Sequence, residues 1–337
     1  MKIGFLKRRW FLGVSLSVAL LAGVLWLLTS LVIDFSPKTK RQSRDFARLA
    51  AQVPGGIQKV ELTSGDGVRL AAWYLPASHP KRADRWGVVL SHGGGDDKAY
   101  YLPLAEEIRG RGFDVILPDL RGNGESAPSP KGMTLGITEG HDVAAAAAFL
   151  ADQEHVQHIA ALGVSMGGVA TLMGAAAEPR IGPLVLESSS YQATSVFDYM
   201  LAQFRMPSGS VRFGLARTLT SVGLWRMGAD WSDAASGALP TWRLAPTLAP
   251  RPVLFVYGDR DPFVHDADVR LFSGRFAGPT RILVFKDTGH GVYHAHPAAY
   301  SAAVMQFLDQ WRDPAIAGGA PGPSEHPNAP SRGPLPR

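Results

Sequence analysis

Cysteine is absent from the 337 residues of this chain, and its absence excludes several kinds of site. The chain can form no disulfide, no thiol nucleophile and no thiolate metal site, whichever compartment it occupies. Charged residues are also few, at 19% of the chain against 46% apolar residues. This balance predicts a full hydrophobic core and one large α/β domain with appendages.

A basic excess is absent from the globular part, although the whole chain carries a net charge of +5. Residues 1–50 contain nine lysines and arginines and two aspartates, which give +7. Residues 51–337 therefore carry a net charge of about −2. A nucleic-acid partner needs clustered positive charge, so none is predicted.

Formal charge is also missing from residues 10–33, a run of 24 mostly apolar residues. As a helix this run would extend about 36 Å, enough to cross a hydrocarbon core of about 30 Å. A cleaved secretory signal is the alternative, but no small-x-small cleavage site follows Ile33. We therefore predict a transmembrane anchor at residues 10–33, with a basic tail at residues 1–9 and a juxtamembrane linker at residues 34–50.

Basic residues flank the predicted anchor on both sides, four before it and five within the next fifteen residues, so their number alone does not decide its orientation. Lys7, Arg8 and Arg9 stand directly before the first apolar residue and oppose translocation of the tail. We therefore expect the tail inside the cell and the rest of the chain outside the cytoplasm.

Strand and helix patterns alternate between residues 51 and 312, which is typical of a mostly parallel sheet with helices on both faces. Residues 57–63 and 68–75 predict an opening hairpin. Short apolar runs predict buried parallel strands at residues 87–90, 114–117, 159–164, 184–186, 253–256 and 282–285. Residues 313–337 contain seven prolines and four glycines, which predicts a disordered tail.

One connection is unusually long. About 60 residues separate the strand that ends near Glu187 from the strand that begins near Pro252. We interpret residues 190–249 as a helical cap over an active site. A pair of packing helices with no role in substrate binding is the alternative.

Residues 163–168, Gly-Val-Ser-Met-Gly-Gly, follow an apolar run that predicts a buried strand. A strand that reverses sharply into a helix pushes the residue at its tip out of the sheet, and only small neighbours fit beside it. Ser165 is therefore a candidate nucleophile, and the backbone N–H of Met166 is a candidate oxyanion donor. Such a short motif arises by chance in many glycine-rich chains, so the interpretation depends on its surroundings.

A nucleophilic serine needs a base and a carboxylate that orients the base. Asp259 and Asp261 follow the strand predicted at residues 253–256, and His290 follows the strand predicted at residues 282–285. The order Ser, Asp, His is the one found in α/β-hydrolases. The spacing alone leaves both aspartates as candidates.

Several motifs together resemble those of the α/β-hydrolases, in register over roughly residues 57–312. They are Ser-His-Gly-Gly-Gly at 91–95, Asp-Leu-Arg-Gly-Asn-Gly-Glu-Ser at 119–126, the serine motif at 163–168, Gly-Asp-Arg-Asp at 258–261 and Gly-His-Gly at 289–291. Within that superfamily the chain is most similar to bacterial membrane-anchored hydrolases of the serine-aminopeptidase-like type, which include lysophospholipase and monoacylglycerol-lipase relatives.

This resemblance implies an α/β-hydrolase fold and the triad Ser165, Asp261 and His290. It also implies a second oxyanion donor at Gly94, with Gly93 as the alternative. Glu187 is an alternative acid, since some relatives have the acid at that strand. Together with the predicted anchor, the resemblance to bacterial membrane-anchored hydrolases implies that the protein is located in a bacterial inner membrane.

We therefore expect a membrane-anchored serine hydrolase that cleaves an acyl or lipid-like ester through an acyl-enzyme, without a cofactor. The spacing of His290, His294 and His296 could suit a metal ion, but no carboxylate or thiol partner stands nearby, so no metal is predicted. A serine peptidase or amidase of the aminopeptidase-like type is the alternative. A non-catalytic binding protein with a hydrolase fold is the second alternative.

Overall fold

The computed structural model describes residues 2–33, 53, 56–79, 84–189 and 191–313, and the side chains of the first helix between residues 14 and 30. The linker predicted at residues 34–50 lies outside the described residues. The tail predicted at residues 313–337 also lies outside them, apart from Asp313.

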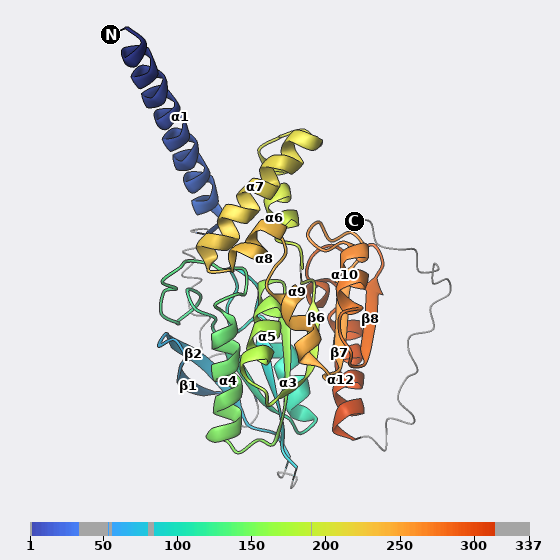
Figure 1. The fold of residues 1–337 in the computed structure, drawn as a ribbon. Coiled ribbons are helices and arrows are strands. Elements are labelled where there is room, and N and C mark those ends of the chain that lie inside the picture. The colour runs from blue at the N-terminus through green and yellow to red at the C-terminus, as the bar shows by residue number, and fades with distance from the viewer. Residues whose placement is uncertain (1, 34–52, 54–55, 80–83, 190, 314–337) are drawn as a thin grey trace.

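An eight-stranded sheet forms the centre of the described chain (Figure 1). Its strand order is β1-β2-β4-β3-β5-β6-β7-β8. The hairpin β1–β2 and the pair β2–β4 are antiparallel, whereas all the other neighbours are parallel, as predicted. The strands are β1 (Gln58–Thr63), β2 (Arg69–Leu75), β3 (Trp86–Ser91), β4 (Asp114–Pro118), β5 (His158–Val164), β6 (Ile181–Glu187), β7 (Val253–Gly258) and β8 (Thr280–Phe285).

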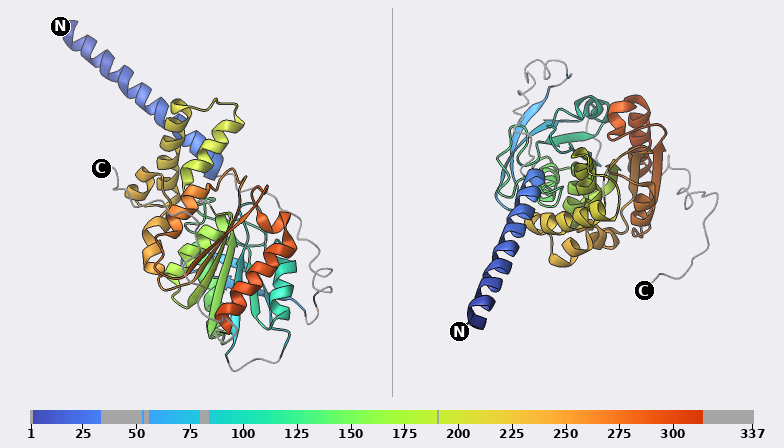
Figure 2. Two further views of the ribbon diagram at one scale, coloured as in Figure 1. Left: turned by 90° about the vertical axis from the view of Figure 1, so that its right-hand side faces the viewer. Right: turned by 90° about the horizontal axis from the view of Figure 1, so that it is seen from above.

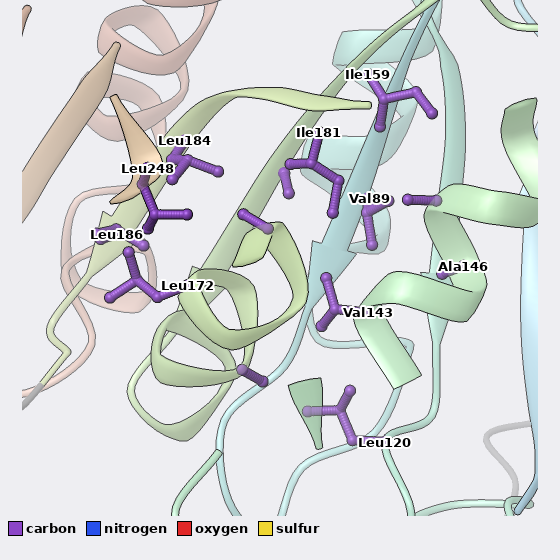
Figure 3. Packing of buried hydrophobic residues seen from close by; sticks show 14 of the residues in the cluster. Val89, Leu120, Val143, Ala146, Ile159, Leu172, Ile181, Leu184, Leu186 and Leu248 are labelled. Atoms are coloured by element: carbon purple, nitrogen blue, oxygen red, sulfur yellow. The ribbon is translucent and has the colours of Figure 1, made fainter. Parts of the chain in front are cut away.

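Helices cover both faces of the sheet (Figures 1 and 2). One face packs against α3 (Leu102–Gly110), α11 (Val292–Ala295) and α12 (Pro297–Arg312). The opposite face packs against α4 (Gly140–Asp152), α5 (Met166–Ala177) and α10 (Asp266–Ser273). Figure 3 shows part of this second layer, where aliphatic side chains of the strands meet those of α4 and α5. Parallel strands buried on both faces explain why the strand segments are almost continuously apolar.

The chain between β6 and β7 is helical. It contains α6 (Ala193–Gln203), α7 (Ser210–Met227), α8 (Trp231–Ser236), α9 (Thr241–Leu244) and a 3-10 turn, η1 (Ala245–Leu248). We call residues 193–248 the cap. It has a small core of its own, which includes Phe197, Leu219 and Leu224 and extends to Val169 of α5.

The N-terminal segment differs from the prediction of a basic tail followed by a membrane span at residues 10–33. A single helix, α1 (Lys2–Ile33), runs through both segments, because lysine and arginine are good helix formers. Within the described part of the chain no helix is long and apolar enough to cross a membrane. The predicted span is therefore not supported.

The backbones of β5 and α5 come very close to each other where the strand turns into the helix. A Cβ atom added to Gly163 would overlap the backbone of Gly167 and come within 2.7 Å of the backbone nitrogen of Gly168. These backbone atoms cannot move without displacing the first turn of α5. Glycine is therefore required at position 163 for steric reasons.

We expect Gly163→Ala to lower the free energy of unfolding by about 2 kcal/mol, the typical cost of overpacking a buried site. Gly182→Ala on β6 is the matched control, because its added Cβ would meet only the carbonyl oxygen of Ile159, at 3.6 Å. Urea unfolding of both variants measures the difference. Equal midpoints for the two variants would contradict the steric argument.

Candidate active site

Ser165 stands at the turn between β5 and α5 with φ of 55° and ψ of −120°. Residues other than glycine rarely adopt this backbone conformation, so contacts with the surrounding residues must hold it in place. The N–H of Ser165 donates to the carbonyl oxygen of Glu187 on β6 at 2.8 Å, and the packing at Gly163 fixes the other side of the turn. The turn predicted at residues 163–168 thus has the strained backbone of a nucleophile elbow.

The glycine loop after β3 lies against this turn. A Cβ atom on Gly93 would stand 3.5 Å from the Cβ of Ser165, and Gly94 lines the same cavity as Ser165. Met166 is the first residue of α5, where a backbone N–H has no acceptor within the helix. The structure therefore brings both predicted oxyanion positions, Gly94 and Met166, to the side of Ser165.

His92 holds the glycine loop in place. Its buried Nε2 accepts a hydrogen bond from the N–H of Leu120 at 3.0 Å, so Nε2 carries no proton. The proton is therefore on Nδ1, which donates to the carbonyl oxygen of Gly93 at 2.7 Å. Both ring nitrogens are occupied, and His92 serves as a brace for the loop.

The motif that follows β4 also braces this region. The buried carboxylate of Asp119 accepts the backbone N–H of Lys98 at 2.8 Å and pairs with the Lys98 ammonium group. Arg121 binds Asp66 at 2.6 Å and Asp142 at 2.7 Å. The hydrogen bond from Arg121 lowers the pKa of Asp66. These side chains tie the loops together and do not line the cavity at Ser165.

His290 is paired with Asp261. Its Nδ1 lies 2.8 Å from Oδ2 of Asp261, whose side chain is completely buried, while the side chain of His290 is 29% exposed. The other oxygen of Asp261 accepts the N–H of Phe263 at 2.9 Å. Asp259 instead accepts the N–H of Thr288 at 3.4 Å. The geometry therefore selects Asp261 over Asp259 as the partner of the imidazole.

Glu187, the alternative acid, has other partners. Its Oε1 accepts the N–H of Tyr293 at 2.7 Å, and its Oε2 accepts the hydroxyl of Tyr101. Burial raises the pKa of this carboxyl group, and the hydrogen bond from Tyr101 opposes the rise. Because Tyr293 is three residues after His290, Glu187 braces the loop that carries the imidazole.

A cavity of about 290 Å³ joins these groups. Its wall is almost entirely apolar and comes from the loops that follow β3, β4, β7 and β8, from the start of α5 and from the cap. The lining residues are Gly94, Met133, Leu135, Ser165, Met166, Val169, Ala193, Val196, Leu239, Phe263 and His290. Ser165 and His290 are the candidate catalytic side chains that line it.

Sequence reasoning missed the residues that shape this cavity. Met133 and Leu135 come from an irregular loop without periodicity, so no pattern marks them. Phe263 had a usable signal, because it is a large apolar residue two positions after Asp261. Its ring centroid lies 4.9 Å from that of His290 and 4.6 Å from that of Tyr199 on the cap.

The other two histidines of this region have separate contacts. Nε2 of His296 is 2.8 Å from Oγ1 of Thr288, and the ring of His294 stacks on Tyr100 with centroids 5.9 Å apart. Among the described residues, no group of three histidine, cysteine or acidic side chains could hold a metal ion.

The sheet order, the strained serine turn and the helical insertion between β6 and β7 define a protein of the α/β-hydrolase class. Solved structures share this fold over most of the chain. The Pyrococcus furiosus esterase Pf2001 aligns with a TM-score of 0.59 and 21% identity over 78% of this chain and 96% of its own. A membrane phospholipase A described as a bacterial virulence factor aligns with a TM-score of 0.55 and 18% identity over 91% of this chain and 99% of its own.

The family model of the alpha/beta hydrolase family matches residues 88–303, and the chain belongs to this family. Among curated proteins, the uncharacterized protein YfhR of Escherichia coli strain K12 is 24% identical over 151 residues, which are 44% of this chain and 52% of YfhR. The chain thus spans about half the length of this relative. The predicted resemblance to α/β-hydrolases is confirmed at the level of family and fold.

We expect Asp261→Asn to lower kcat by about four orders of magnitude, because an amide can hold the imidazole in the wrong tautomer and cannot stabilise its charged form. Asp259→Asn is the matched control and should change kcat by less than about tenfold, since Asp259 does not contact His290. Steady-state kinetics on a soluble ester measure both. A larger loss in the Asp259 variant would assign the acid to that residue instead.

Proposed function

We propose that this protein is a serine hydrolase that cleaves carboxylic esters through an acyl-enzyme. The observation that carries the proposal is the hydrogen bond between His290 and a buried Asp261, on the same cavity as a strained Ser165. A buried carboxylate paired with a partly exposed imidazole is the arrangement of a general base.

In the proposed reaction, Oγ of Ser165 attacks the ester carbonyl and His290 takes the hydroxyl proton. Asp261 occupies Nδ1, so Nε2 is the nitrogen that accepts the proton. The N–H groups of Met166 and Gly94 stabilise the negative oxygen of the tetrahedral intermediate, and each such donor contributes about 3 kcal/mol. His290 then returns the proton to the leaving alcohol. A water molecule, activated by the same base, releases the acid.

The cavity supports an acyl or lipid-like ester. An apolar wall binds a hydrocarbon chain, and no carboxylate is among the described residues that line this cavity. An aminopeptidase needs such a group to bind the charged amino terminus of its substrate, so the peptidase alternative has less support. Two structures with this fold are described as an esterase and as a membrane phospholipase A, which agrees with an ester substrate.

We expect a fluorophosphonate probe to label the wild type and not Ser165→Ala, because the probe reacts only with an activated serine. The wild type should also hydrolyse p-nitrophenyl acyl esters faster than aminoacyl p-nitroanilides. Ser189→Ala is the control, because it also removes a serine hydroxyl that is buried close to α5. The probe should label this variant as it labels the wild type. Equal labelling of Ser165→Ala would exclude this nucleophile, and a preference for the anilides would favour the peptidase.

We also propose that α1 holds the enzyme at a membrane. Among the described side chains of α1, seven large aliphatic ones are exposed, and they are Val14, Leu16, Val18, Leu20, Leu21, Val24 and Leu27. Exposed apolar surface of this extent is costly in water, and lipid covers it favourably.

We expect the full chain to stay in the membrane pellet after a carbonate wash, because apolar contacts with lipid resist high pH. A variant with serine in place of Leu16, Leu20 and Leu27 should move to the supernatant. Protease added to intact spheroplasts should digest the catalytic domain if it lies outside the cytoplasm, as the basic tail predicts. Wild type in the supernatant would contradict membrane attachment, and protection from protease would contradict the orientation.

A further inference from the structure

Exposed apolar side chains gather on the cap. Among the described residues outside α1, the large apolar side chains with high exposure are Tyr199, Phe204, Val211, Phe213, Trp225 and Trp231 on the cap and Leu271 on α10. Three of them flank the turn between α6 and α7, with exposed fractions of 68% for Phe204, 78% for Val211 and 55% for Phe213. A cluster of this kind marks an interaction surface, whereas single exposed residues are ordinary.

This turn and α1 project from the same end of the molecule (Figures 1 and 2). Arg226 of α7 joins the cap to α1. Its guanidinium group lies 3.8 Å from the ring centroid of Trp26 and donates to the carbonyl oxygen of Trp26 at 2.8 Å and to Oγ of Ser30 at 3.1 Å. A partner surface that binds the exposed apolar side chains of α1 therefore also lies close to the cap.

Charge indicates the nature of that surface. The cap, residues 193–248, contains five arginines and three aspartates and so carries a net charge of +2, whereas residues 51–337 as a whole carry about −2. Arg205 and Arg217 are exposed beside the apolar turn. Aromatic and aliphatic side chains bordered by arginine are typical of segments that bind the interface of an anionic bilayer.

We propose that the cap itself docks on an anionic lipid bilayer. Phe204, Val211 and Phe213 enter the interface between headgroups and acyl chains, while Arg205 and Arg217 bind lipid phosphates. Ala193, Val196 and Leu239 of the same cap line the cavity at Ser165, so docking brings the cap that covers this cavity to the bilayer. The proposal rests on the proposed function for the substrate and for the attachment through α1, and the binding of the cap is measured separately from both.

The absence of cysteine allows a direct test, because each single-cysteine variant of the full chain carries one label. The variants Val211→Cys, Leu20→Cys and Leu271→Cys replace side chains that are 78%, 70% and 64% exposed, on the cap, on α1 and on α10. Each receives nitrobenzoxadiazole, a fluorophore whose emission moves to the blue in lipid. The proteins are mixed with vesicles of phosphatidylcholine and phosphatidylglycerol, with or without nitroxide-labelled acyl chains.

The proposal requires the Val211 and Leu20 labels to shift to the blue and to be quenched by the nitroxide, while the Leu271 label stays in water. Quenching at Leu20 without quenching at Val211 would overturn docking by the cap and leave attachment through α1 intact. Absence of quenching at both positions would overturn both. A Val211 label that is shielded without vesicles, increasingly at higher protein concentration, would assign the surface to a second copy of the chain.

The role of charge has its own test. With Arg205→Gln and Arg217→Gln added, quenching of the Val211 label should fall in vesicles that contain phosphatidylglycerol and change little in pure phosphatidylcholine. Equal quenching with and without the arginines in anionic vesicles would overturn the phosphate contacts. None of these fluorescence measurements depends on ester hydrolysis. A protein that docks on vesicles but hydrolyses no ester would therefore contradict only the proposed catalysis.

Discussion

Helix α5 passes so close to the end of β5 that only glycine fits at position 163, and the conformation of Ser165 follows from that contact. The helix cannot move away, because its other side packs on α4 and on neighbouring strands. The strain at Ser165 is therefore supported by the burial of a whole layer of the protein. The same packing brings the N–H of Met166 and the glycine loop after β3 to the serine.

The acid–base pair is held by a different set of contacts, on the loops after β7 and β8. Asp261 is buried and binds both the imidazole and a backbone N–H, so its carboxylate has little freedom to turn away. Glu187 holds the backbone at Tyr293, and Oγ of Ser188 accepts the N–H of Gly291 at 3.2 Å. These two contacts fix the backbone that follows His290. The geometry of the proposed active site comes from strand ends, which the parallel sheet brings to one edge.

The candidate site residues could be predicted because each follows an apolar strand within a motif that contains glycine, which is a local pattern. The spacing left both Asp259 and Asp261 open, and the resemblance to α/β-hydrolases favoured Asp261, which the structure pairs with His290. Both follow β7, and only the three-dimensional path of the loop turns Asp261 towards His290 and Asp259 towards Thr288. The residues of the cavity wall could not be predicted from the sequence, because Met133, Val169 and Leu239 are distant in the chain. They come together only because the cap packs on α5.

The sequence by itself determined the order of strands and helices, the nucleophile turn and the positions of the candidate acid and base. It could do so because periodicity, glycine sterics and strand ends are properties of neighbouring residues. Only the tertiary structure decided which carboxylate pairs with His290, which residues brace the loops and where apolar side chains stay exposed on the cap. These depend on contacts between segments far apart in the chain, and short-range patterns do not contain that information.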